Sequence, residues 1–252
     1  LSVNYRLNEA FALNMNVARY HQIPAYTILG YRNNAGTLVN KDNGLEYIRA
    51  DHYVFGLEYR TKKSSRITLE GFYKNYSNYP FSLKDSICLA NQGSDFGVVG
   101  NEAVKSISEG RTYGAEFLFQ QKLYKGFYSV FAYTYVISEF LDKKGAYVPT
   151  AWDSRHIVSL TGGKRFKKGW EFGMRWLFSG GSPYTPYDIP TSSLIANWNI
   201  NGIGLLDYSK LNTQRESSFH QLNVRLDKKF FLDKFNLNFY FDIQNLYGYK
   251  TK

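Results

Sequence analysis

The chain has 252 residues and a formal charge of +10, from 31 lysines and arginines against 21 aspartates and glutamates. A single cysteine excludes an internal disulfide and a cysteine-rich zinc scaffold, and an aromatic content of 18% excludes a disordered chain. No apolar run approaches the ~18 residues of a membrane-spanning helix, and mean hydropathy is −0.40, so any membrane span must be made of strands.

Apolar and polar residues alternate with a period of two along most of the chain, which indicates β-strands with two different faces. The pattern predicts ten strands, at about 1–8, 10–21, 50–61, 66–79, 110–121, 127–139, 154–165, 170–181, 217–229 and 236–247. Short turns alternate with long polar loops, which lie at about 22–49, 80–109, 140–153 and 182–216. This organisation is typical of an outer-membrane β-barrel.

Alternation alone also fits a soluble antiparallel sheet with one wet face. Two further features favour a membrane barrel. The first is that the polar face stays charged in mid-strand, as suits a wet lumen. The predicted lumen-facing residues are Glu58, Glu70, Glu116, Arg175, Arg225 and Asp242.

The second feature is a concentration of aromatic residues at both strand ends, as expected for girdles at two membrane interfaces. At the long-loop end these are Tyr76, Tyr79, Tyr135, Tyr184, Tyr187, Tyr247 and Tyr249. At the short-turn end they are Phe11, Tyr59, Tyr124, Phe127, Phe166, Trp170 and Phe231.

Several segments, in order, resemble the C-terminal half of a TonB-dependent outer-membrane receptor of the Bacteroidota type. They are Leu69-Glu-Gly-Phe-Tyr-Lys-Asn-Tyr-Ser-Asn-Tyr-Pro80, Tyr113-Gly-Ala-Glu-Phe117, Thr150-Ala-Trp-Asp-Ser-Arg-His156, Ser179-Gly-Gly-Ser-Pro-Tyr-Thr-Pro186 and Phe241-Asp-Ile-Gln-Asn-Leu-Tyr247. The resemblance implies an all-β fold: an antiparallel transmembrane segment of about ten strands from a plugged barrel of about 22.

We therefore expect residues 1–252 to be one partial barrel domain, without the plug, the first strands and the last strand. Leu1 follows no signal peptide, which fits a mature protein, a cytoplasmic one or a fragment. Ten strands cannot close a barrel of this type, and an open edge in lipid leaves backbone groups unpaired. The missing strands would come from the same receptor or from another chain.

The resemblance implies active uptake of a scarce, bulky nutrient across the outer membrane, such as a siderophore or other metal chelate, a peptide or a glycan. No catalytic residues and no cofactor are expected. The implied partners are outer-membrane lipid, the plug and remaining strands, the TonB–ExbB–ExbD complex and, as an optional addition, a surface lipoprotein. A passive porin, an adhesin-type barrel and a soluble β-sandwich binding domain remain as alternatives.

Aromatic and polar loops suit ligand binding. The predicted substrate-contacting residues lie in two of the long loops: Tyr26, Tyr31, Arg32, Tyr47, Tyr184, Tyr187, Asp188, Trp198 and Asp207. The alternative for these tyrosines is a place in the outer girdle.

The remaining features have simple structural interpretations. His21, His52, His156 and His220 lie at long-loop ends without metal-ligand spacing, so no metal site is expected. Basic residues cluster at three short turns, which suits a rim facing lipid head groups better than a nucleic-acid site. These clusters are Arg60, Lys62, Lys63 and Arg66; Lys164, Arg165, Lys167 and Lys168; and Lys228, Lys229 and Lys234. Gly180 and Gly181 are expected to relieve crowding, and Cys88 to be inert.

Overall fold

The computed structural model describes residues 1–62, 64–92 and 99–250, so Lys63 of the first basic cluster lies outside the described residues. Ten strands form one antiparallel sheet in chain order, and a short eleventh, β7, pairs with β6. The ten are β1 (Ser2–Arg6), β2 (Phe11–Gln22), β3 (Ile48–Arg60), β4 (Ser65–Ser82), β5 (Val104–Tyr124), β6 (Phe127–Leu141), β8 (Arg155–Arg165), β9 (Trp170–Ser179), β12 (Phe219–Phe231) and β13 (Asn236–Ile243). All ten predicted strands are thereby confirmed, with β5 beginning six residues earlier than expected.

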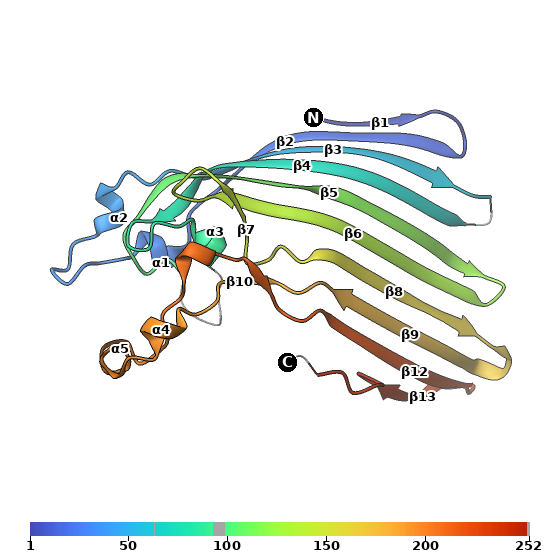
Figure 1. Cartoon of the computed structure of the whole chain (residues 1–252). Helices are drawn as coiled ribbons and strands as arrows, with labels where there is room; N and C mark the ends of the chain where they lie inside the picture. The colour runs from blue at the N-terminus through green and yellow to red at the C-terminus, as the bar shows by residue number, and fades with distance from the viewer. Residues whose placement is uncertain (63, 93–98, 251–252) are drawn as a thin grey trace.

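The remaining elements are short and lie in the long loops. They are β7 (Tyr147–Pro149), β10 (Pro183–Tyr184) and β11 (Gln214–Arg215), the helices α1 (Tyr26–Leu29), α2 (Val39–Asp42), α3 (Leu89–Gln92), α4 (Ile189–Ser192) and α5 (Ile195–Asn201), and the 3₁₀ turns η1 (Lys167–Gly169) and η2 (Tyr208–Lys210). All of them except η1 gather at one end of the sheet, and the short turns lie at the other (Figure 1). None of the described helices is long and apolar enough to cross a membrane.

The short turns use residues suited to reversing a strand directly. Lys125 and Gly126 connect β5 to β6, with φ of 49° and 85°. A two-residue hairpin of this kind needs positive φ at both positions, which glycine adopts without strain.

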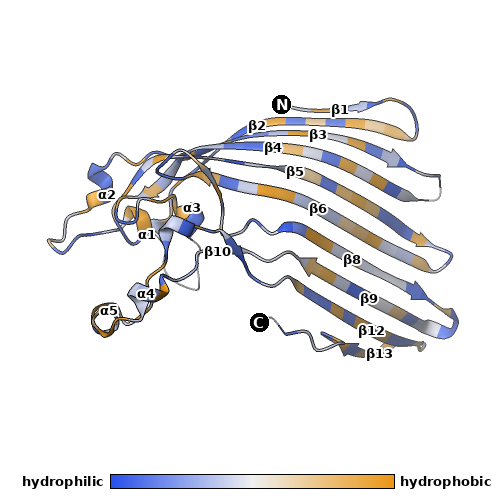
Figure 2. Cartoon of the chain, viewed as in Figure 1, coloured by the Kyte–Doolittle hydropathy of each residue, from blue (hydrophilic) through white to orange (hydrophobic). Residues whose placement is uncertain are grey.

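The pairing register separates two faces of the sheet. Phe55, Leu57 and Leu69 lie on the outward face, where the side chains of most strands are apolar through mid-strand. Coloured by hydropathy, the strands show alternating apolar and polar residues (Figure 2). The opposite face, here called the inner face, carries polar and charged side chains at the intervening positions.

A row of polar residues closes the outward apolar band at the long-loop end. Asp51, Asn75, Arg111 and Glu139 are register neighbours on four consecutive strands. The Arg111 Nε lies 2.7 Å from a Glu139 carboxylate oxygen, and Arg19 makes a similar 2.6 Å contact with Asp51. From this row to the polar row at Ser65 and Gln121 is about ten residues, or ~34 Å along a strand.

The apolar segment of the outward face lies at a different level on each strand, and its position shifts progressively from one side of the sheet to the other. Its centre is near Gly56 on β3 and near Val224 on β12. Following the register from Val224 back across six strand pairs leads to the level of Thr61, about five residues beyond Gly56. A band that lies level in a membrane then requires a strand tilt of roughly 30°, from rises of ~3.4 Å and strand spacings of ~4.8 Å. This is close to the tilt of membrane barrels.

Two of the tyrosines predicted for the outer girdle face inward instead. Tyr76 and Tyr79 pack around Phe140, with ring centroids 5.4 and 4.7 Å away, and with Cys88 and Ala90 of the 83–103 loop. The girdle prediction is wrong for these two residues because the loop folds back over the inner face and buries them.

Because the two faces differ in environment, we expect an introduced charge to destabilise the protein more on the outward face than at the adjacent inward position. Phe117 faces outward between Leu69 and Tyr133, whereas Leu118 faces inward between Thr68 and Ala132. In lipid vesicles, Phe117→Arg should lower the free energy of unfolding by about 2–4 kcal/mol. Leu118→Arg should cost much less because its charge reaches the polar face.

Urea unfolding of the receptor in vesicles, followed by tryptophan fluorescence, measures both variants. Equal losses for Phe117→Arg and Leu118→Arg would contradict the assignment of the two faces.

Candidate functional site

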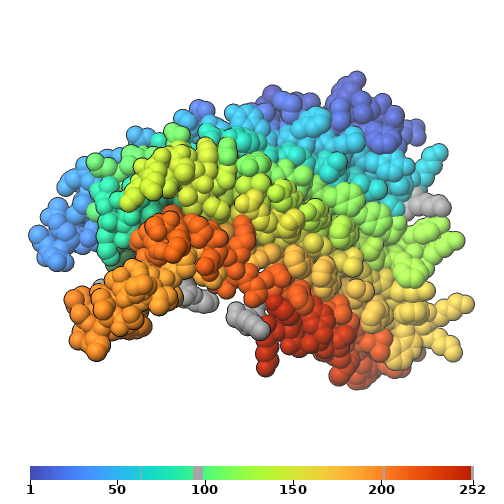
Figure 3. Space-filling view, viewed as in Figure 1, coloured from blue at the N-terminus to red at the C-terminus, as the bar shows by residue number. Residues whose placement is uncertain are grey.

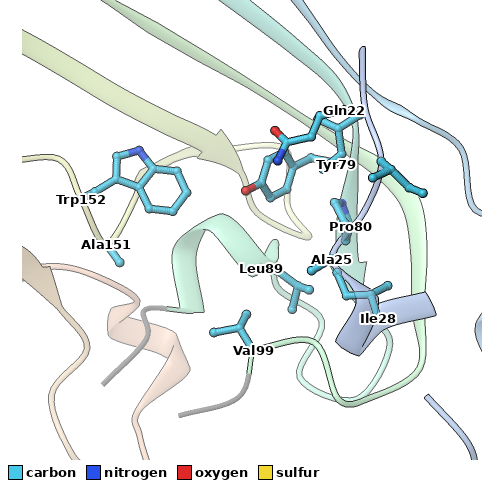
Figure 4. A pocket seen from close by; sticks show the side chains of 11 residues that line it. Gln22, Ala25, Ile28, Tyr79, Pro80, Leu89, Val99, Ala151 and Trp152 are labelled. Carbon is cyan, nitrogen blue, oxygen red and sulfur yellow. The ribbon is translucent and has the colours of Figure 1, made fainter. Parts of the chain in front are cut away.

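The inner face is hollowed at its long-loop end by two adjoining pockets of about 240 and 320 Å³. The two share Gln22, Ile48, Tyr79 and Trp152. Strands β2 to β6 form the floor, and three long loops form the rim. Figure 4 shows the first pocket, with Trp152 and Ala151 on one side of it and Pro80 and Ile28 on the other. We refer to the combined space as the hollow.

The lining of the hollow is aromatic, aliphatic and neutral. Ile28, Leu89 and Val99 line one end, and Gln22, Thr112 and Ser138 offer neutral polar groups elsewhere. Among the described lining residues there is no lysine, arginine, aspartate or glutamate, and His52 and the tyrosines are the ionisable ones. The site can therefore stack on flat or apolar groups and exchange hydrogen bonds, without complementing a large net charge.

Asn40 holds the 22–49 loop against the chain at the start of β5. Its side chain is fully buried and donates to the carbonyl oxygens of Ile28 and Glu102, at 2.7 and 2.8 Å. Its own oxygen accepts from the backbone N–H of Val104 at 2.8 Å. One amide thus hydrogen-bonds three backbone groups from separate segments, although the Ile28 carbonyl oxygen also accepts from the Tyr31 N–H at 3.3 Å.

Asn212 makes the corresponding connection on the other side of the hollow. Its amide donates to the carbonyl oxygens of Asn91 and Pro149, at 2.8 and 2.7 Å, and its oxygen accepts from the Thr185 hydroxyl. These partners come from three different loops, so their relative positions are fixed by one side chain.

Asp153 anchors the loop that carries Trp152. It is fully buried, accepts from the Ser138 N–H at 3.0 Å and pairs with Arg215 at 2.6 Å and Arg155 at 2.9 Å. Two guanidinium groups and a backbone donor supply the partners that a buried carboxylate needs. Breaking this group would release the loop beside the hollow.

Gly180 and Gly181 let two loops approach closely, as predicted. A Cβ on Gly181 would lie 1.7 Å from the Glu216 carbonyl oxygen, and one on Gly180 would lie 2.2 Å from that of Ser154. No side chain fits between these backbones.

The six residues predicted to face the lumen all lie on the inner face of the sheet. Glu70 and Glu116 are register neighbours, and Arg225 lies 4.0 Å from Asp242. Glu58 pairs with Arg60 and with Arg66, and Arg175 stands apart between Thr161 and Asn223. Whether this face borders a lumen remains a prediction.

None of the nine residues predicted to contact substrate lines the hollow. Tyr26, Tyr47, Tyr187 and Trp198 are exposed on the loops, whereas Tyr184 donates to Gln214 at 2.6 Å. Tyr31 is half-buried, and Arg32 donates to the Gly36 carbonyl oxygen at 2.6 Å. Their role in ligand contact stays a prediction.

The two acidic members of that set have local structural roles. Asp188 accepts from the Thr191 N–H and caps α4. Asp207 caps η2, and hydrogen bonds from Ser209 and Lys210 lower the pKa of its carboxyl group. Both carboxylates thus shape the 180–218 loop.

The sequence predicts no functional role for Trp152, Asn40, Asn212 or Asp153. Trp152 and Asp153 lie within the Thr150–His156 motif, so that motif was an available signal. Nothing local distinguishes Asn40 or Asn212 from the other loop asparagines, because their partners lie up to 121 residues away.

His52, His156 and His220 contact aromatic rings. His156 lies 2.9 Å from the Tyr133 hydroxyl and His220 lies 2.8 Å from that of Tyr247. Across residues 1–62, 64–92 and 99–250, no three His, Cys, Asp or Glu side chains gather as metal ligands would. Cys88 is fully buried, and this burial raises the pKa of its thiol to about 11, which disfavours the reactive thiolate.

Comparison with known proteins agrees with the fold. The family model described as "TonB dependent receptor-like, beta-barrel" matches residues 1–246. No curated protein sequence matches the chain.

Three solved structures, of one receptor and two transporters, resemble the chain at low sequence identity. The ferripyoverdine receptor of the outer membrane of Pseudomonas aeruginosa is 16% identical with a TM-score of 0.63, over 97% of this chain and 28% of that one. The ferric citrate transporter FecA is 16% identical with a TM-score of 0.67, over 99% and 33%. The copper transporter OprC is 10% identical with a TM-score of 0.63, over 99% and 33%. The chain spans about a third of the length of these proteins.

The cross-loop hydrogen bonds generate a testable expectation. Asn40→Ala removes one hydrogen bond from each of three backbone groups and takes away the partner of the buried Val104 N–H, at about 1–3 kcal/mol for a group left unsatisfied. The amides of residues 99–104 should then exchange hydrogen for deuterium faster, as measured by mass spectrometry of the folded receptor.

Asn199→Ala is the matched control because Asn199 is exposed on α5. It should leave exchange in residues 99–104 unchanged. Unaltered protection in Asn40→Ala would show that the loop is held by other contacts.

Proposed function

The chain belongs to the TonB-dependent receptor β-barrel family, and from that membership we propose that it forms part of a receptor for active uptake of a scarce, bulky nutrient. Barrels of this family are non-enzymatic transporters of the outer membrane. The observation that carries the proposal is the family match over residues 1–246, together with one continuous antiparallel sheet over the same residues.

The remaining parts of the receptor are also proposed. Ten strands, from β1 to β13, leave two unpaired sheet edges, which hydrocarbon does not tolerate. We infer that further strands complete a barrel of about 22 and that a plug fills its lumen. TonB, ExbB and ExbD would supply energy from the proton-motive force to remodel the plug. A surface lipoprotein is an optional partner, and the Bacteroidota type rests on the sequence motifs alone.

The hollow supports a neutral ligand more than a polyanionic chelate. The compared proteins are a receptor bound to ferripyoverdine, a ferric citrate transporter and a copper transporter. Here Trp152 and Tyr79 offer ring faces, and Gln22, Thr112 and Ser138 offer neutral hydrogen-bonding groups. A glycan or a peptide with an aromatic side chain suits this lining better than an iron–citrate complex would.

Two adjacent glutamates on the inner face support contact with a plug. Glu70 and Glu116 are directly opposite on β4 and β5, and neither forms an ion pair within the part of the chain that the structure describes. Like charges at this spacing, ~5 Å between Cβ atoms, repel each other. A lysine or arginine from the plug would remove the repulsion, which gives the two glutamates a role in holding the plug.

The alternatives differ from this proposal in specific ways. A soluble β-sandwich requires a second sheet over the apolar face. The ten strands instead form a single sheet, and the chain matches a membrane barrel family. A passive porin would share the barrel but would need no energy and no plug.

Energy dependence tests the proposal directly. Cells that carry the intact receptor should deplete at least one bulky compound from a rich medium, as measured by mass spectrometry against a deletion strain. A protonophore should abolish this depletion. Depletion that continues unchanged with the protonophore would favour the porin.

The same assay tests the hollow. Trp152→Ala should slow depletion about tenfold because it removes a ring face worth ~1–2 kcal/mol of ligand contact. Phe235→Ala is the control, since Phe235 is similarly exposed, 56% against 53%, but lies in the β12–β13 turn at the opposite end of the sheet from the hollow. Equal effects of the two substitutions would place ligand contact elsewhere.

The glutamate pair yields a separate expectation. In the intact receptor, Glu70→Gln/Glu116→Gln should weaken the attraction to the plug and increase hydrogen exchange of plug amides. Asp233→Asn, at the β12–β13 turn, is the control and should not change plug exchange. If the double variant protects the plug more strongly, the glutamates do not hold it through charge.

A further inference from the structure

Two lysines face outward at the short-turn end of the sheet. Lys164 on β8 is paired in register with Phe127 and Phe172, and Lys228 on β12 is paired with Trp170. These neighbours belong to the outward face, so both ammonium groups lie where the apolar band ends. We refer to Lys164 and Lys228 as the outward lysine pair.

Basic residues on the inner face at the same level have acidic partners. Glu171 pairs with Arg165 at 3.3 Å and with Lys229 at 3.1 Å. Asp227 pairs with Arg225 at 2.8 Å. The inward positive charge is therefore largely compensated within the protein.

The outward lysine pair has no such compensation. Neither lysine forms an ion pair with any of the described residues, and the carboxylates of β9 and β12 at this level, Glu171 and Asp227, face inward. Lys167 and Lys168, exposed in the η1 turn between the pair, add further positive charge. Four positive charges thus gather where the outward apolar surface meets the short turns.

Aromatic rings hold the lysine side chains at this boundary. The Lys164 Nζ lies 4.2 Å from the centre of the Phe127 ring, and the Lys228 Nζ lies 5.2 Å from that of Trp170 and 4.9 Å from that of Phe230. Both lysines are half-buried. Their stems follow apolar surface while the ammonium groups stay at the polar edge, a suitable arrangement for a membrane interface.

We propose that the outward lysine pair binds the phosphate head group of an anionic phospholipid in the periplasmic leaflet of the outer membrane. Short turns of outer-membrane barrels face the periplasm, so the site opens to that leaflet. The acyl chains lie along the apolar side chains above it, including Phe172 and Leu226, which are exposed. This continuity with the apolar band selects a membrane lipid over free phosphate, which would remain in water.

Native mass spectrometry of the intact receptor in detergent tests the site. The protein is titrated with dioleoyl phosphatidylglycerol or with dioleoyl phosphatidylethanolamine, which has the same chains and no net charge. The wild type should bind phosphatidylglycerol more tightly. Lys164→Gln/Lys228→Gln should weaken that binding about thirtyfold and leave phosphatidylethanolamine binding unchanged.

Two further variants separate the site from total charge and from misfolding. Lys143→Gln/Lys144→Gln makes the same charge change at exposed positions of the long-loop end and should bind phosphatidylglycerol as the wild type does. Lys164→Arg/Lys228→Arg should retain binding because it keeps the charges. Equal loss in both glutamine variants, equal binding of the two lipids by the wild type, or displacement by millimolar inorganic phosphate would overturn the proposal.

Discussion

The fold depends on one constraint: in hydrocarbon, each backbone N–H and C=O group must find its partner within the protein. The chain meets it with long antiparallel strands, each paired with its sequence neighbours, so that unpaired edges occur at β1 and β13. Period-two alternation then follows from the two environments, since a one-residue slip would turn every apolar side chain inward. The apolar band is staggered across the sheet because the strands must tilt for the band to lie level in the membrane.

In the long loops, outside the apolar band, backbone groups find partners in a different way. The loops contain few strand pairs. Two buried side-chain amides and one buried carboxylate hydrogen-bond several backbone groups instead. Asn40, Asn212 and Asp153 each bind residues from other loops or strands. The loops consequently form a preorganised rim around the hollow, and a ligand would lose less free energy in ordering them. One loop segment, α4 to α5, stands clear of the sheet, with Ile195 and Ile200 largely exposed (Figure 3).

The strands were predictable because their signal is local. Alternation identified all ten. The register also puts Glu58, Glu70, Glu116, Arg175, Arg225 and Asp242 on one face, and the prediction that this face borders a lumen stays a prediction. Alternation failed where distant contacts decide the outcome. The first residues of β5 pair with an extension of β4, and Tyr76 and Tyr79 are buried by a folded-back loop. The hollow depends on Trp152, and the neighbouring Asp153 is held by Arg215, 62 residues away. Residue type alone could select exposed loop tyrosines, but it could not bring them to a common cavity.

The meander order has a consequence for how such a chain assembles. Each strand hydrogen-bonds to its immediate neighbours in the sheet, so hairpins can be added one after another at a growing edge without threading any segment through another. For the same reason a break in the polypeptide at a short turn removes no pairing between strands. Two separately synthesised pieces that meet at such a turn could rejoin edge to edge with their register set by side-chain alternation.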